Sequence, residues 1–224
     1  MFLGHFALAF GAKQASPAVS LGALFLACQF ADLLWPVLVL LDVEQLRVLP
    51  GATSVTPLDF VSYPFSHSLI ALAGWGLLVG GVYMAATRSR LSAAGILGLL
   101  VVSHWLLDVV THRPDMPLTL TGTRRFGLGL WHSLPATLAA ELLLLTVGVA
   151  LYRGATVARD RIGSAGLSSL VVFLVVVYGA SVFGPLPPDD RTVAWSALAM
   201  WLLVVWAYWV DGHRSPVASF GGRR

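Results

Sequence analysis

The residues most suited to catalysis or metal binding are two histidines and an aspartate spaced four positions apart: His104, Asp108 and His112. Residues four apart lie on one face of an α-helix, so the three side chains predict a single polar stripe. The positions between them, such as Leu106 and Val109, are apolar. An ionisable side chain inside a membrane costs at least about 2.5–3.5 kcal/mol unless a partner or a function compensates it. The stripe therefore predicts a buried site.

Three further ionisable residues, His5, Asp32 and His67, also stand in apolar surroundings. Helical rise from the expected inner end of each segment places Asp32 about 18 Å and His104 about 20 Å across the membrane, with Asp108 about 6 Å higher. By the same measure His5 reaches the middle of the membrane, and His67 enters from the outer side. We expect all five side chains to meet in the outer half of the membrane.

Three imidazoles and two carboxylates are typical ligands of a divalent metal such as zinc. A bound cation would also offset the cost of burying both carboxylates. We therefore predict that the five residues hold a divalent metal ion, with zinc as the first choice. An alternative stays open, in which Asp108 pairs with His104 or His112, and Asp32 pairs with His5, only to hold the helices together.

Three more residues are candidate proton carriers for a reaction at such a metal. His112 ends the stripe and leads into Arg113 and Asp115, and Glu141 stands alone inside a later apolar run. We predict catalytic roles for His112, Asp115 and Glu141 as acids or bases.

Two other types of catalytic or structural chemistry are not expected. Ser66 and Ser68 flank His67, but neighbours in sequence point apart on a helix, so a serine nucleophile is not predicted. Cys28 is the only cysteine, which excludes an intramolecular disulfide and a cysteine metal cluster.

The elements that carry these residues are membrane spans. Of 224 residues, 57% are apolar and 11% charged, and the mean hydropathy is +0.81, which is outside the range of soluble domains. A span needs about 20 apolar residues. Runs of that kind lie at 19–41, 66–87, 91–111, 133–152, 165–184 and 192–211. We predict an all-α, polytopic transmembrane helix bundle of about six spans.

The remaining segments complete this picture. Residues 1–12 are apolar but too short to span, and lack the basic start of a signal peptide, so they predict a half-inserted helix. One integral membrane domain over 1–224 is expected, with the metal-site region in 1–120 and further helices in 133–211. No linker divides it.

Charge predicts orientation and partners. Alternating the spans places nine of the 14 Lys and Arg residues on one side and five on the other. The positive-inside rule then puts both chain ends in the cytoplasm and the long loops, 42–65 and 112–132, outside. The basic residues are scattered near the ends of spans, so we expect membrane lipids and no nucleic acid as partners. The sequence carries no signal of oligomeric state.

The order of these polar residues along the chain resembles the pattern of the bacterial membrane-bound metal-dependent hydrolase family, over roughly residues 1–120. The matching elements are His5, Asp32, Ser66-His67-Ser68, and His104 to Asp108 followed by Thr111. Leu34 and Ser62 stand where the family pattern often has a second aspartate and a first histidine. The resemblance implies a multi-pass protein of the bacterial inner (plasma) membrane. It also implies a hydrolase in which metal-activated water attacks an ester or phosphoester. The location of the site in the membrane suggests that this substrate is linked to a lipid.

Two other functions remain as alternatives. The same residues could serve a non-catalytic metal- or proton-handling membrane protein, as a transport site or relay. Transport favours a polar path to the cytoplasm, but the inner halves of the first and third spans, 21–26 and 92–100, are apolar or small. In the last alternative the protein is a scaffold with buried packing pairs.

Overall fold

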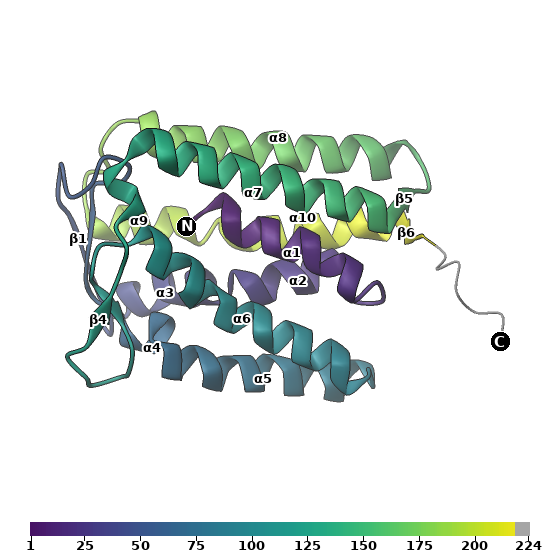
Figure 1. The fold of residues 1–224 in the computed structure, drawn as a ribbon, viewed down its shortest axis with the longest axis horizontal. Helices are drawn as coiled ribbons and strands as arrows, with labels where there is room; N and C mark the ends of the chain where they lie inside the picture. Colours follow the sequence, from purple (N-terminus) through teal and green to yellow (C-terminus); the bar gives the residue numbers. More distant parts are fainter. Residues whose placement is uncertain (218–224) are drawn as a thin grey trace.

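Long apolar helices dominate the computed structural model, which describes residues 1–217 (Figure 1). The α-helices are α1 (Leu3–Ala15), α2 (Leu21–Cys28), α3 (Phe30–Leu40), α4 (Pro64–His67), α5 (Leu69–Thr87), α6 (Leu91–Thr111), α7 (Leu134–Ala155), α8 (Arg161–Phe183), α9 (Asp190–Ala197) and α10 (Met200–Gly212). A short 3-10 helix, η1 (Leu130–His132), precedes α7. The prediction of an all-α helix bundle is confirmed.

Short antiparallel strand pairs join some of the helices. They are β1 (Gln45–Val48) with β2 (Leu58–Ser62), β3 (Met116–Pro117) with β4 (Arg125–Phe126), and β5 (Thr156–Ala158) with β6 (Arg214–Pro216). The first two pairs lie at one end of the bundle, which we call the loop end and define as residues 41–63 and 112–133. The third pair lies at the opposite end, the turn end, together with the α5–α6 turn at 88–90.

Five helical stretches are long and apolar enough to cross a membrane: α5, α6, α7, α8 and Asp190–Gly212, which joins α9 and α10. The predicted first run is not a straight helix, because α2 and α3 meet at Gln29 with a bend of 54°. Counting this bent pair as one span gives six, the predicted number.

The outer surface of these helices is suited to lipid. Leu77 is 81% exposed, Leu99 70% and Leu202 69%, and each lies on a different helix. Soluble monomers rarely expose apolar patches of this extent, whereas hydrocarbon chains solvate them without cost. The chain is therefore an integral membrane protein.

Helix α1 lies in the centre of the bundle and packs against α7, α2 and α6 (Figure 1). Its 13 residues span about 20 Å, which is less than the hydrocarbon thickness, as expected for a helix that does not cross. Phe6 and Phe10 are buried and contact Phe25, with ring centroids 4.8 and 5.1 Å away. The N-terminal segment is thus a core element, and its position decides where His5 lies.

The turn-end terminus of α1 is fixed by a buried ion pair. Lys13 Nζ donates to Asp211 Oδ2 of α10 at 2.7 Å, and Tyr152 of α7 donates its hydroxyl hydrogen to Asp211 Oδ1 at 2.7 Å. The amide of Leu21 donates to the same carboxylate. Three helices and the start of α2 are therefore joined at one buried aspartate.

Glycine permits the close contact between α1 and α7. A Cβ atom added at Gly148 would lie 2.3 Å from the carbonyl oxygen of Ala7, a separation that real side chains do not show. By contrast, a Cβ at Gly179 of α8 would meet nothing within 4 Å. Only the first glycine is required by packing.

We expect Gly148→Ala to destabilise the protein by about 1–3 kcal/mol, because overpacking forces α1 away from α7. Gly179→Ala is the matched control and should be neutral or stabilising by up to about 1 kcal/mol, since alanine favours a helix. Thermal unfolding in detergent checks both. Equal stability of the two variants would contradict the close packing described for α1.

Candidate metal centre

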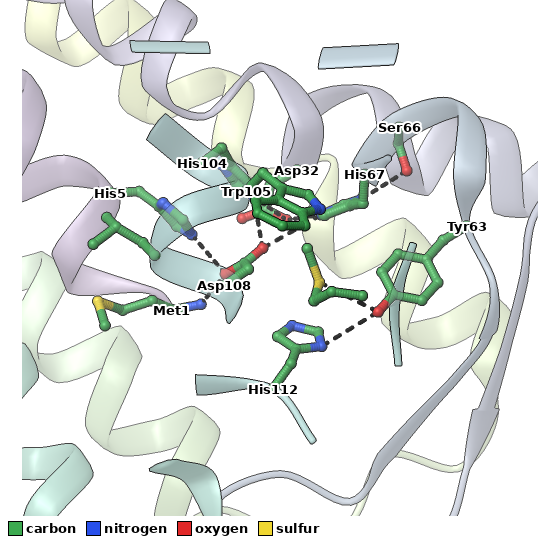
Figure 2. Close-up of polar contacts among 12 residues, drawn as sticks. Met1, His5, Asp32, Tyr63, Ser66, His67, His104, Trp105, Asp108 and His112 are labelled. Carbon is green, nitrogen blue, oxygen red and sulfur yellow. Dashed lines mark hydrogen bonds and ion pairs between the residues drawn. The ribbon is translucent and has the colours of Figure 1, made fainter. Parts of the chain in front are cut away.

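Four helices bring the five predicted metal ligands together near the loop end (Figure 2). His5 comes from α1, Asp32 from α3, His67 from the last position of α4, and His104 and Asp108 from successive turns of α6. Four of the five residues are at most 3% exposed, and the side chain of Asp32 is 25% exposed. The expected meeting of these side chains thus occurs, and Asp32 marks its most open side.

His67 and His104 each lie within 4 Å of both carboxylates. His104 Nε2 lies 3.2 Å from Asp108 Oδ2 and 3.7 Å from Asp32 Oδ1. His67 Nε2 lies 3.4 Å from Asp32 Oδ1 and 3.9 Å from Asp108 Oδ2. Ligand atoms bound at about 2.1 Å in a tetrahedral zinc site lie about 3.4 Å apart. These separations approach that spacing, and Asp32, His67 and His104 form a compact group that could hold a divalent ion.

The hydrogen bond on the far side of His104 fixes how its ring faces the carboxylates. His104 Nδ1 lies 2.8 Å from the carbonyl oxygen of Cys28, the last residue of α2. A carbonyl only accepts, so Nδ1 carries the hydrogen and Nε2 of the neutral ring has a lone pair. This buried Nε2 has no hydrogen-bond partner among the described residues. A metal ion, or a proton on Nε2, would compensate this arrangement of a ring nitrogen and two carboxylates.

His5 approaches the same aspartate from another side. Its Nε2 lies 3.1 Å from Asp108 Oδ1, and its ring stacks on that of His104 with centroids 3.7 Å apart. His5, His104 and Asp108 also form a group with metal-ligand spacing. The backbone nitrogen of Met1 donates to Asp108 Oδ1 as well. Asp108 is therefore the central group, with one oxygen toward His5 and the other toward His67 and His104.

The structure contains one pair of the helix-packing alternative, Asp108 with His104, but not the other. Asp108 contacts His5 and His104, and Asp32 contacts His67 and His104. Neither the Asp32–His5 pair nor the Asp108–His112 pair is present among the described contacts. All five side chains share one connected cluster instead of forming two separate pairs.

His112 leaves the predicted stripe. Helix α6 ends at Thr111, and His112 has an extended backbone, with φ −66° and ψ 151°. Its Nδ1 lies 2.9 Å from Asp115 Oδ1, and its ring packs against Trp131 with centroids 4.3 Å apart. His112 and Asp115 therefore form a separate pair at the loop end.

Tyr63 extends this pair in a way that the sequence does not indicate. Its hydroxyl donates to Asp115 Oδ1 at 2.9 Å and lies 3.4 Å from His112 Nδ1 (Figure 2). Burial, and then the Asp115 carboxylate, raise the pKa of Tyr63 well above its ordinary value. Burial is also the larger influence on His112 and lowers the pKa of its imidazole, although Asp115 acts in the opposite direction. His112 is thus a neutral imidazole with its Nδ1 hydrogen directed at a carboxylate, which orients Nε2 as a base.

Glu141 contacts α1 and not the cluster. Its two carboxylate oxygens accept hydrogen bonds from the amides of Phe2 and Gly4, both at 2.8 Å. A carboxylate at the first turn satisfies unpaired amides and interacts favourably with the helix dipole. The contacts give Glu141 a role in holding the turn that carries His5, and its predicted catalytic role stays a prediction.

The expectation that Ser66 and His67 point apart is wrong. Ser66 Oγ lies 2.7 Å from His67 Nδ1, because α4 is a single turn that ends at His67. The hydroxyl also lies 2.5 Å from Glu44 Oε2, so it is enclosed between two partners. Glu44 was not predicted, since nothing in Leu41-Asp42-Val43-Glu44 distinguishes it from a solvated loop acid.

Comparison with known proteins adds no relative: no family model, curated protein or solved structure matches the chain.

We expect Glu141→Ala to loosen the first turn of α1. Two backbone hydrogen bonds to a charged group would be lost, at about 1.5–3 kcal/mol each, so local opening should increase roughly 10²–10⁴-fold. Hydrogen exchange of the peptide that contains Phe2 and Gly4 measures this. Thr146→Ala, which removes an exposed hydroxyl from the same helix, is the control, and unchanged exchange in Glu141→Ala would refute the anchoring role.

Proposed function

We propose that the protein is a membrane-embedded metal-dependent hydrolase whose metal ligands are His5, Asp32, His67, His104 and Asp108. The observation that carries the proposal is the unpartnered Nε2 of His104, which faces both carboxylates from within the bundle. The residue types suit zinc or a similar divalent ion. The resemblance over residues 1–120 supports hydrolysis and a bacterial inner membrane.

The protein residues would divide the chemistry between two groups. A divalent ion in the cluster would polarise an ester or phosphoester and acidify water. His112, oriented by Asp115 and Tyr63, would accept a proton from the attacking water and return it to the leaving oxygen. The apolar helices around the cluster would exclude bulk water, which strengthens the electrostatic interactions within it.

The location of the cluster supports a lipid-like substrate. Asp108 lies three residues before the end of α6, which is about 5 Å below the loop end. This depth matches the boundary between headgroups and acyl chains, and the partly exposed Asp32 gives an open side. An ester or phosphoester bond in a membrane lipid, or in a lipid-linked molecule, would lie at this level.

Metal content tests the site. The protein purified in mild detergent should contain roughly one zinc or other divalent ion per chain by elemental mass spectrometry. His104→Ala and Asp108→Asn should lose it, because each removes a ligand atom from the centre of the cluster. His132→Ala and Asp42→Asn are matched controls at exposed positions and should retain it. Absence of metal from the native protein after resupply would refute the proposal.

Turnover tests the reaction. With the metal-loaded protein and ester or phosphoester lipids, Asp115→Asn should lower kcat roughly 10²–10⁴-fold while the metal content stays unchanged, since His112 would lose the carboxylate that orients it as a base. Tyr63→Phe should have a smaller effect, because Asp115 keeps its contact with His112. Full metal occupancy with no hydrolysis of any ester would instead favour a metal- or proton-handling protein.

A further inference from the structure

A buried carboxylate stands behind His67 on the side away from the cluster. Glu44 is 1% exposed and lies between α3 and β1. Its Oε1 accepts hydrogen bonds from the amides of Phe65 and Ser66, at 2.8 and 2.9 Å, and its Oε2 lies 2.5 Å from Ser66 Oγ. Ser66 Oγ is in turn 2.7 Å from His67 Nδ1 (Figure 2). Three groups therefore form a chain that ends at a predicted metal ligand.

The direction of these hydrogen bonds follows from the donors and acceptors. An ionised carboxylate only accepts, so the single hydrogen of the Ser66 hydroxyl points to Glu44. Ser66 Oγ must then accept from His67 Nδ1, which places the ring hydrogen on Nδ1 and leaves a lone pair on Nε2. Two backbone amides donate to Oε1 of the same carboxylate, so both of its oxygens act as acceptors.

We propose that Glu44 is a positioning residue that acts through Ser66 to hold His67 in the tautomer that can bind a metal through Nε2. The relevance of Glu44 to catalysis rests on the proposed metal site. The tautomer of His67 follows from the hydrogen bonds alone and does not depend on that site. His104 reaches the same state by a different route, through the carbonyl of Cys28. Both imidazoles therefore present Nε2 to the carboxylates before any ion binds, and no ring hydrogen has to be displaced from it.

Glu44 also holds the start of α4 through Phe65 and Ser66, so a variant must separate this structural contact from the effect on His67. Glu44→Gln makes the separation. The glutamine oxygen can still accept from both amides, but its amide group donates to Ser66 Oγ. The hydroxyl hydrogen would then turn to His67 Nδ1, and the ring hydrogen would move to Nε2.

The first experiment measures the tautomer in the metal-free protein. Nitrogen-15 NMR of histidine-labelled protein in detergent distinguishes a hydrogen on Nδ1 from one on Nε2, and the His67 signals are assigned by their loss in His67→Gln. The native protein should carry the hydrogen on Nδ1, Ser66→Thr should keep it there, and Glu44→Gln should move it to Nε2. A native His67 with its hydrogen on Nε2, or no change in Glu44→Gln, would overturn the inference.

Zinc titration then measures the consequence. Loss of such an orienting partner lowers metal affinity roughly 10–100-fold, so Glu44→Gln and Ser66→Ala should bind zinc that much more weakly than the native protein. Ser66→Thr keeps the hydroxyl and should restore the affinity. Native-like zinc binding by Glu44→Gln would refute the positioning role. If the tautomers behave as expected but the native protein binds no zinc, the proposed metal site fails and the tautomer assignment stands.

Discussion

The carboxylate of Asp108 is buried in a helix that crosses the membrane, and three imidazoles and the terminal ammonium group of Met1 lie around it. In hydrocarbon this group is stable only if positive charge or hydrogen bonds compensate it. Its neighbours come from α1, α4 and α6, and Asp32 of α3 contacts two of the same imidazoles, so these elements must meet near one point. The bundle is arranged around that requirement.

Several parts of the chain that lie far apart in sequence hold the residues around Asp108 in place. The end of α2 at Cys28 leaves a carbonyl for His104, and Glu141 of α7 holds the turn that carries His5. At the opposite end, Lys13 and Asp211 fix the other terminus of α1. These contacts hold α1, which is too short to cross the membrane, at the depth of Asp108. Apolar packing alone would not fix that depth.

The sequence predicts well what depends on local pattern. The cost of exposing backbone and charge to hydrocarbon makes spans visible as apolar runs, and helical rise is regular enough to align His104 with Asp32 in depth. These two rules were sufficient to group the five cluster residues. They fail where the chain leaves regular helix, as at Gln29, where α2 and α3 bend, and at His112, which is extended instead of helical.

The supporting contacts were not predictable for a related reason. Glu44 lies 22 residues before Ser66, and Tyr63 lies 52 residues before Asp115, so each pair forms only when loops fold over the end of the bundle. Such loops carry no periodicity, and their acidic residues resemble solvated ones in sequence. Glu141 is a different case. The sequence shows a carboxylate that would be costly to bury inside a span, but not its partners, since the amide of Gly4 lies 137 residues earlier.

We propose above that imidazole and carboxylate groups of this cluster bind a divalent ion. X-ray absorption spectroscopy of the zinc-loaded protein in detergent tests it directly, because it reports the atoms around the ion. We expect nitrogen and oxygen ligands at about 2.0–2.1 Å, with outer-shell scattering from at least two imidazoles. A sulfur ligand at about 2.3 Å, which only a cysteine or methionine could supply, or a hydrated ion without imidazole scattering, would contradict it.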